Sequence, residues 1–478
     1  MLKKEIEYIK NKKTVSAGIG YTIGNILIMG ISFLTIPIFT RILSTSDYGL
    51  YNTFMAYASI CSILIGFGLH TSIKAANIEF DKRIDEYVSN IIILSMLLLV
   101  VFFAIVITCG GIVSNYFGYS QLLLIVLLLQ SEAGAIISIY NNRLSLDYSY
   151  KKYLIVSFFT SVGSIVLSLI FIFIIFKNER YVGRILGGAI PSIISALIII
   201  YLLFSKKKPT IKKDQIGFAL KYSAPIVPHG LSQILLSQFD RIMIQRMIGS
   251  AQAGIYSFSY SIATIPQIIA SSLDTVWGPW FFEQYKEQKI ELIKKRSSQY
   301  VMLFSIITVG IMAVSPEIIH IMASKDYWES VYLVIPIVLS TYFIFLYYLP
   351  AQIEYYEKKT VNIAIGTMGA ATLNIALNYI FIPKYGYIAA AYTTLFSYIC
   401  NFVFHIIAAK KIAGVLPFAG SKILVQIITV CASAILIYFA IESIILRLLI
   451  VASASILLLV SDKTNIKVLM KVGKGDNE

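Results

Sequence analysis

This chain is poor in charged residues. Asp, Glu, Lys and Arg make up 14% of its 478 residues, whereas a soluble globular protein contains about 25%. Hydrophobic residues make up 58%, and the mean hydropathy is +0.78. A soluble globular fold is therefore excluded, and the composition is that of an all-α polytopic membrane protein.

Cysteines and recognisable cofactor motifs are also scarce. The four cysteines are scattered within or at the ends of apolar segments and lack metal-ligand spacing. The phosphate-binding loop G-x-x-x-x-G-K-[ST] is absent, and no soluble segment is long enough for an ATPase domain. We therefore expect no disulfide, no metal site and no cofactor, and any transport must draw on an ion gradient, the membrane potential or another subunit.

Long apolar runs recur along the whole chain. A helix needs roughly 20 apolar residues to cross a bilayer core of about 30 Å. We expect fourteen membrane-spanning helices, at residues 16–40, 50–70, 90–109, 120–140, 153–176, 183–204, 217–245, 254–274, 300–322, 332–352, 360–382, 386–408, 423–440 and 447–461.

The basic residues predict the orientation of these helices. With a cytoplasmic N-terminus, the inner segments carry 30 of the 40 Lys and Arg residues and the outer ends carry 9. Because basic residues are retained on the cytoplasmic side, we expect a multi-pass protein of the cell membrane with both termini cytoplasmic. The net charge of +15 is then mainly a topology signal with affinity for anionic membrane lipids, and nucleic acid is not an expected partner.

Two halves of the chain resemble each other. "RILSTSDYGLYN" at 41–52 aligns with "RMIGSAQAGIY" at 246–256 at an offset of 205 residues, and "ERYVGRILGGAI" at 179–190 resembles "PKYGYIAAAY" at 383–392 at an offset near 203. An even number of predicted helices separates the copies, which predicts a parallel repeat like that of two-lobed secondary transporters.

The repeat predicts the domain organisation. Two six-helix lobes, residues 1–204 and 217–408, are joined by a basic cytoplasmic linker at 205–216, and residues 409–478 add two helices and a cytoplasmic tail. Interruptions at matching depths of the first and seventh helices point to a binding site in such proteins; here they are Gly18, Gly20 and Gly24 in the first helix, and Pro225, Pro228 and Gly230 in the seventh.

A polar stripe follows the predicted seventh helix. His229, Gln233, Ser237 and Arg241 are spaced four residues apart, with Asp240 beside the last. Such residues share a helix face, and ionisable groups inside a membrane usually face a cavity or a partner. We expect all five to contribute to a substrate cavity. The alternatives are an Asp240–Arg241 ion pair at the outer helix end and a satisfied interior His229.

Three further residues are candidates for function. Glu132 lies near the middle of the fourth helix with no basic residue near it in sequence, so it is either protonated or paired across helices. Glu132 and Asp240 are the candidates for ion coupling. Asp274 and Lys221, at the cytoplasmic ends of two predicted helices, are candidates for a gate.

Three stretches together carry a resemblance to a known family. They are "RILSTSDYGLY" after the first helix, "DRIMIQRMIGSAQAGIYSFSYSIA" across the seventh and eighth, and "FIPKYGYIAAAYTTLFSY" entering the twelfth. The pattern resembles the Wzx-type oligosaccharide and polysaccharide flippases, whose superfamily also contains the MATE drug exporters and the lipid II flippases. The resemblance implies a MATE-like fold with a V-shaped cavity between two lobes and a rocker-switch cycle.

The resemblance also implies a function. Such proteins pass polyprenyl-pyrophosphate-linked oligosaccharides, of the undecaprenyl type, from the cytoplasmic to the outer leaflet. The expected partners are this substrate, membrane lipids, and the polysaccharide polymerase and export machinery, with the flippase acting as a monomer. Lipid II flippases carry an arginine in the first helix, whereas residues 16–40 hold no charge. A capsule, O-antigen or teichuronic-type unit is therefore favoured.

Two rival functions remain open from the sequence. A cation-coupled MATE-type drug exporter would need an acidic cavity in place of the mixed polar stripe. A membrane glycosyltransferase or polymerase would need catalytic carboxylates on a longer outer segment, and the predicted outer loops are short. The sequence therefore favours a transporter over an enzyme.

The stripe gives a first prediction. Arg241→Ala removes the stripe's only cation that is always charged, so we expect surface polysaccharide to be lost while the amount of protein in the membrane stays unchanged. Polysaccharide production and membrane abundance are measured in the same cells. Normal polysaccharide in this variant would remove Arg241 from the mechanism.

Overall fold

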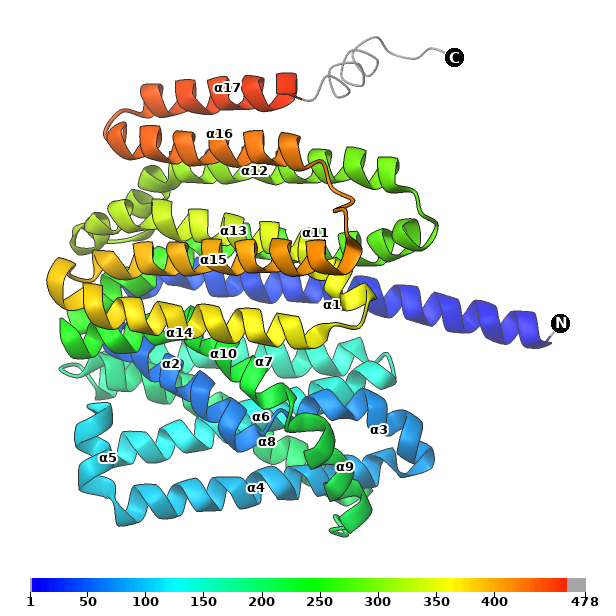
Figure 1. The fold of residues 1–478 in the computed structure, drawn as a ribbon. Coiled ribbons are helices and arrows are strands. Elements are labelled where there is room, and N and C mark those ends of the chain that lie inside the picture. The colour runs from blue at the N-terminus through cyan, green and yellow to red at the C-terminus, as the bar shows by residue number, and fades with distance from the viewer. Residues whose placement is uncertain (1, 462–478) are drawn as a thin grey trace. The chain divides into compact units, whose positions relative to one another are not determined.

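The protein is all-helical throughout the part that its structure describes. The structure, a computed structural model, describes residues 2–461, with side chains described for Gly18 and residues 20–460. Each secondary-structure element in this part is a helix (Figure 1). Contacts divide the chain into two units, residues 1–242 and 243–478, which are described separately below.

Unit 1 contains the N-terminal helices. In chain order they are α1 (Leu2–Ile42), α2 (Thr45–Gly66), the 3-10 helix η1 (Leu69–Ser72), α3 (Ile73–Phe80), the 3-10 helix η2 (Asp81–Arg83), α4 (Ile84–Thr108), α5 (Gly110–Phe117), α6 (Gln121–Leu146), α7 (Tyr150–Ile170), the π-helix η3 (Phe171–Ile175), α8 (Arg180–Lys206), α9 (Lys213–Ser223) and most of α10 (Ile226–Met247).

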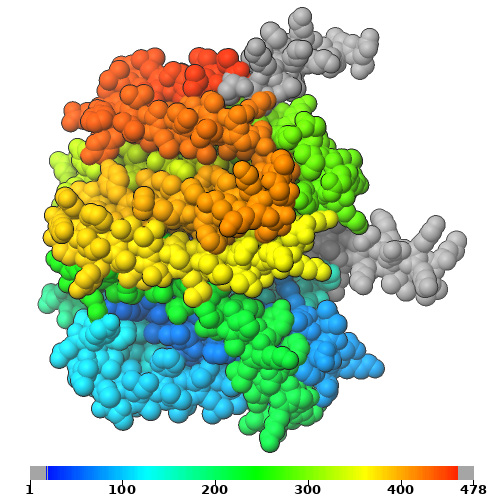
Figure 2. All heavy atoms as spheres, in the orientation of Figure 1, coloured from blue at the N-terminus to red at the C-terminus, as the bar shows by residue number. Residues whose placement is uncertain are grey.

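Unit 2 contains the remaining helices. They are α11 (Ser250–Lys286), α12 (Ile290–Met322), the 3-10 helix η4 (Lys325–Ser330), α13 (Val331–Tyr356), α14 (Thr360–Tyr385), α15 (Ile388–Ala413), α16 (Gly420–Phe439) and α17 (Ile444–Ser461). Side chains of α14 and α15 pack side by side on one face of this unit (Figure 2).

The chain is a multi-pass membrane protein. Eleven helices in the described part are long and apolar enough to cross a membrane, fewer than the fourteen that the sequence predicts. The other three predicted spans are also helical. Two of them, α10 and α11, are less apolar than the eleven, and the apolar part of α17 is shorter.

The seventh predicted span is interrupted and forms two helices, α9 and α10. α9 ends at Ser223 and α10 begins at Ile226. Pro225 stands between them, and proline has no N–H to continue the hydrogen-bond ladder of a helix. Pro228 fits the first turn of α10, where N–H groups have no partner within the helix. The first span differs from the prediction, because α1 runs without a break through its three glycines.

The two copies of the repeated loop have the same helix boundaries. α1 ends at Ile42 and α2 begins at Thr45, and 205 residues later α10 ends at Met247 and α11 begins at Ser250. In the first copy the Ser44 hydroxyl accepts a hydrogen bond from the Asp47 N–H at 3.0 Å, which caps α2. The repeated sequence therefore encodes a repeated helix–loop–helix corner.

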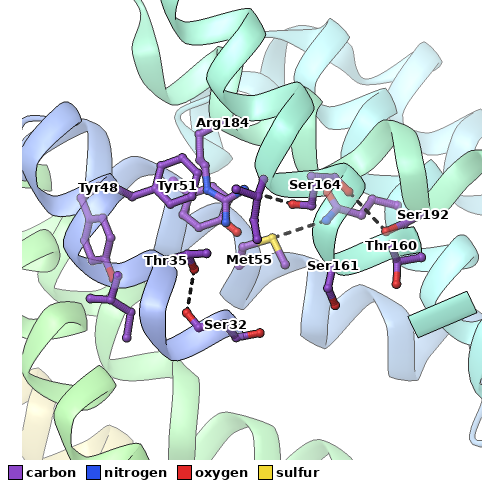
Figure 3. Close-up of a pocket in the computed structure, with 15 residues that line it drawn as sticks. Ser32, Thr35, Tyr48, Tyr51, Met55, Thr160, Ser161, Ser164, Arg184 and Ser192 are labelled. Carbon is purple, nitrogen blue, oxygen red and sulfur yellow. Dashed lines mark hydrogen bonds between the residues drawn. The ribbon is translucent and has the colours of Figure 1, made fainter. Parts of the chain in front are cut away.

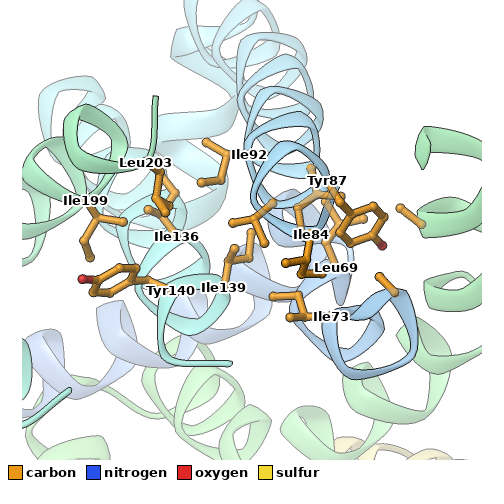
Figure 4. Packing of buried hydrophobic residues seen from close by; sticks show 14 of the residues in the cluster. Leu69, Ile73, Ile84, Tyr87, Ile92, Ile136, Ile139, Tyr140, Ile199 and Leu203 are labelled. Atoms are coloured by element: carbon orange, nitrogen blue, oxygen red, sulfur yellow. The ribbon is translucent and has the colours of Figure 1, made fainter. Parts of the chain in front are cut away.

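Unit 1 has an apolar core formed by α4, α6 and α8 together with η1 and α3. Ile92, Ile139 and Ile199 are among its fully buried side chains (Figure 4). Tyr87 is also buried there, and its hydroxyl satisfies its hydrogen-bonding needs with the Ser72 Oγ at 2.6 Å.

Unit 2 pairs its buried ionisable groups across helices. Arg447 of α17 forms two hydrogen bonds with the Glu317 carboxylate of α12, at 2.7 and 2.5 Å. His405 of α15 lies 2.7 Å from Glu354 of α13, with both side chains fully buried. Such pairing reduces the large cost of placing charge inside a membrane.

The predicted linker is bound to the start of α4. The Asn90 side-chain oxygen accepts hydrogen bonds from the backbone N–H groups of Thr210 and Ile211, at 2.8 and 3.1 Å. Lys212 forms an ion pair with Glu86 at 2.6 Å. These contacts fix the backbone of the linker on unit 1.

Removing the Asn90 side chain should therefore loosen the linker. We expect Asn90→Ala to speed trypsin cleavage between Lys206 and Lys213 several-fold, because protease access follows local opening of the backbone. Cleavage is followed by mass spectrometry of the purified protein. Asn142→Ala is the matched control, since that amide donates to the Ser138 carbonyl of its own helix. Equal rates in both variants would contradict the prediction.

Candidate functional site: a cationic pocket in unit 1

A polar pocket of about 390 Å³ lies within unit 1, among α1, α2, α6, α7 and α8 (Figure 3). Hydroxyl groups are its commonest polar feature. They belong to Ser32, Thr35, Thr160, Ser161, Ser164 and Ser192, together with the two tyrosines Tyr48 and Tyr51.

Arg184 of α8 supplies the positive charge of the pocket. Its Nη1 donates hydrogen bonds to the hydroxyls of Ser164 and Ser168 on α7, at 3.1 and 2.8 Å. Its Cζ lies 4.0 Å from the centre of the Phe39 ring and 4.5 Å from that of the Tyr51 ring. The two rings hold the guanidinium by cation–π attraction and fix its plane.

The pocket has a net positive charge. None of its lining residues is acidic, and no ion pair to Arg184 exists within residues 20–460. The hydrogen bonds to Ser164 and Ser168 use Nη1, which leaves the Nε and Nη2 donors for a ligand. A guanidinium with free donors matches the geometry of phosphate and carboxylate oxygens.

Close packing of α7 on α8 brings these groups together. A Cβ atom added at Gly187 would lie 2.4 Å from the backbone N and Cα of Ser168, so only glycine allows this approach. At Gly188, one residue further, an added Cβ would meet Ser164 at an ordinary 3.5 Å. The small residues on α8 therefore set the depth at which Arg184 reaches the hydroxyls of α7.

Gln130 of α6 adds an acceptor to the pocket wall. Its amide nitrogen lies 3.5 Å from the Met55 sulfur, while its side-chain oxygen is buried and has no hydrogen-bond partner in the described part of the chain. Buried polar atoms are usually satisfied, so this oxygen is an exception among the polar atoms of the pocket wall.

The stripe predicted on the seventh helix lies on α10. Asp240 is fully buried and Arg241 is 8% exposed, and Arg241 donates to the Ser237 carbonyl and to the Gln238 side-chain oxygen. His229 is half-buried and Gln233 is exposed. The helix is continuous through these positions, so their four-residue spacing does place them on successive turns. Their role in binding stays a prediction.

Glu132 lies inside unit 1 between α6 and α4. One carboxylate oxygen accepts a hydrogen bond from the Ser95 hydroxyl at 2.8 Å, and the other is buried without a hydrogen-bond partner among the described residues. The side chain is 4% exposed. The sequence leaves Glu132 either protonated or paired with a basic residue of another helix. No basic partner of Glu132 is found among the described residues.

The two gate candidates lie in different units. Asp274 is on α11 in unit 2, where it accepts a hydrogen bond from the Gln352 amide at 2.9 Å. Lys221 is on α9 in unit 1 and is exposed. A gating role for either residue stays a prediction. Within the described residues, no group of His, Cys, Asp and Glu side chains could hold a metal ion.

Reasoning from the sequence missed the Arg184 pocket. Arg184 lies four residues after Arg180 near a helix end, where it counts as one of the outer basic residues. A signal was present in the neighbouring apolar span, since "TSVGSIVLS" at 160–168 places hydroxyls at 160, 161, 164 and 168. Those positions lie three and four residues apart on one helix face.

Comparisons with known proteins agree on a family. A profile of the family described as "Polysaccharide biosynthesis protein" matches residues 15–285. A probable low-salt glycan biosynthesis flippase, Agl15 of Haloferax volcanii, is 23% identical over 80% of this chain and 80% of its own length. The Lsg locus putative protein 1 of Haemophilus influenzae is 21% identical over 71% of this chain and 84% of its own length.

Solved structures share the fold. The lipid II flippase MurJ in its inward closed conformation matches with a TM-score of 0.70 and 16% identity, over 92% of this chain and 97% of MurJ. A MATE-family multidrug resistance transporter in its inward-facing conformation matches with a TM-score of 0.59 and 15% identity, over 80% of this chain and 99% of the transporter. The expected MATE-like fold is thereby confirmed.

Proposed function

We propose that this chain, which belongs to the polysaccharide biosynthesis protein family, moves lipid-linked glycans across a membrane. The substrate is a polyprenyl-pyrophosphate-linked oligosaccharide repeat unit, carried from the cytoplasmic to the outer leaflet by alternating access. It serves a surface polysaccharide of the capsule or O-antigen type. The observation that carries this proposal is a cationic pocket rich in hydroxyl groups at Arg184, with no acidic residue in its lining.

The chemistry of the pocket fits the headgroup of such a lipid. Pyrophosphate oxygens accept charge-assisted hydrogen bonds from a guanidinium, and each bond to a charged group is worth about 1.5–3 kcal/mol. Sugar hydroxyls both donate and accept, which suits the pocket's serines and the unpartnered Gln130 oxygen. The rings of Phe39 and Tyr51 keep the guanidinium in place before the ligand arrives.

The charge of the substrate also provides a driving force. An inside-negative membrane potential drives an anion outward, which is favourable by about 2.3 kcal/mol per charge for each 100 mV. The pocket also has to release the substrate after transport. An anion dissociates more readily from a single arginine than from a cluster of basic residues. A cationic drug would be repelled by Arg184, which disfavours the drug-exporter alternative.

The α10 residues complete the proposal. His229, Gln233, Ser237, Asp240 and Arg241 form a second polar surface along the substrate path, as their spacing predicts. Asp274 and Lys221 act at the cytoplasmic gate. Polysaccharide polymerase and export proteins receive the flipped product.

Replacing Arg184 tests the pocket. We expect Arg184→Gln to weaken binding of undecaprenyl-pyrophosphate-linked N-acetylglucosamine roughly 10- to 100-fold, because a charge-assisted contact is lost. Arg184→Lys keeps the charge but lacks the planar guanidinium fork, so its affinity should lie between those of the wild type and Arg184→Gln. Binding is measured on the full chain in lipid nanodiscs by fluorescence of a labelled probe.

A neighbouring lysine provides the control for this experiment. Lys177→Gln removes one positive charge from the loop before α8 without changing the pocket lining. Its affinity should equal that of the wild type. If Arg184→Gln binds the probe as well as Lys177→Gln does, the pocket is not the headgroup site.

Glu132 is our proposed titrating group for ion-coupled transport. Glu132→Gln should keep the fold, because the amide oxygen can accept the Ser95 hydrogen bond. It should remove the stimulation of probe transport by an imposed pH gradient in proteoliposomes, while probe binding persists. Glu79→Gln, which changes an exposed carboxylate on α3, is the control. Stimulation that survives in Glu132→Gln would exclude this role.

A further inference from the structure

An apolar groove of about 930 Å³ lies between α1 and α7 in unit 1. Leu27, Ile31, Ile155, Phe158 and Val162 are among the residues that form it, and no charged or polar side chain lines it. Several of these side chains are strongly exposed, with Leu27 at 61% and Ile155 at 68%. The groove is therefore an open hydrocarbon surface along two membrane-spanning helices.

The groove and the Arg184 pocket share the same two helices. On α1, Ile31 lines the groove and the next residue, Ser32, lines the pocket. On α7, Ser161 lines the pocket and the next residue, Val162, lines the groove. Neighbouring residues of a helix point in directions about 100° apart, so the α1–α7 pair has a polar side and an apolar side that adjoin.

Close contacts at one end hold this helix pair together. An added Cβ at Gly20 would lie 2.3 Å from the Tyr150 ring, and one at Gly24 would lie 1.9 Å from Leu154. The Tyr153 hydroxyl donates to the Asn25 side-chain oxygen at 2.5 Å. Gly20 and Gly24 thus serve helix packing, and they set the spacing of the two walls where the groove begins.

The groove is long on the scale of a bilayer. It includes residues 154–166 of α7, which at 1.5 Å per residue extend about 18 Å, more than half of a hydrocarbon core of about 30 Å. An extended chain can therefore lie along most of one leaflet against α1 and α7.

We propose that this groove holds the hydrocarbon chain of the same lipid whose headgroup occupies the Arg184 pocket. The proposal rests on the proposed function, and the adjoining polar and apolar sides of the α1–α7 pair carry it. A polyprenyl chain lies in the groove, and its head end crosses the edge formed by Ile31, Ser32, Ser161 and Val162. Its pyrophosphate and sugars then enter the pocket that contains Arg184. The α1–α7 pair then keeps the tail in the lipid phase while the headgroup is bound in the pocket.

The proposal predicts a dependence of affinity on chain length. Two probes share one pyrophosphate-linked N-acetylglucosamine headgroup, and one carries a full polyprenyl chain whereas the other carries a single isoprene unit. The bilayer already dissolves the chain, so the groove adds packing but little hydrophobic driving force. We expect Leu27→Trp and Phe158→Trp, which obstruct the groove, to reduce the long-to-short affinity ratio roughly threefold to tenfold relative to the wild type.

The control changes a lipid-facing residue outside the groove. Leu97 of α4 is 55% exposed, and Leu97→Trp should leave the affinity ratio unchanged in the same nanodiscs. The groove proposal is overturned if Leu27→Trp and Phe158→Trp leave the affinity ratio unchanged. It is also overturned if Leu97→Trp lowers the ratio equally, because the chain would then contact only the general lipid-facing surface. If Arg184→Gln still weakens binding of the short-chain probe, the headgroup proposal stands even when the groove proposal fails.

Discussion

The backbone contact between α7 and α8 is the constraint on which the site depends. Gly187 allows α8 to approach the backbone of Ser168, and this approach places Arg184 within hydrogen-bond distance of two hydroxyls on α7. A larger residue at Gly187 would push the helices apart, and Arg184 would then lose both serines and its place over the Phe39 ring. The position of the charge therefore depends on helix packing, since small residues allow helices to approach closely inside a membrane.

Arg184 is partly buried, and it differs from the buried Arg447 and His405 in its contact partners. Arg447 and His405 of unit 2 each have a carboxylate partner on another helix, which explains them as structural pairs. Arg184 has serines and aromatic rings in place of a carboxylate. A carboxylate would neutralise Arg184 permanently, whereas hydroxyls and rings hold the guanidinium in position and leave its charge for an anion. That difference is why Arg184 is a functional candidate and Arg447 is not.

Apolar periodicity and repeated loops carried most of the fold prediction. They located the helices, the membrane class and the family, and the repeated corner recurs with the same helix boundaries 205 residues apart. Proline chemistry predicted the break near Pro225, but glycine did not interrupt α1, because glycine in a membrane helix can serve close packing instead. The pocket was harder to predict, since it requires Arg184 of one helix to meet serines of another, and sequence alone does not give the rotation of two helices about their axes.

The proposed headgroup site lies in only one copy of the repeat. The offset near 203 places Arg184 over Tyr387, Ser164 over Thr367 and Ser168 over Ala371. Duplication thus preserved the helices and loops, while the charge stands in one copy. In the proposed cycle an anion has to be bound in one conformational state and released in another, and a ligand with equal affinity for both states shifts neither. A single arginine in one copy of the repeat would supply the binding charge of the proposed site at a low cost of charge inside the membrane.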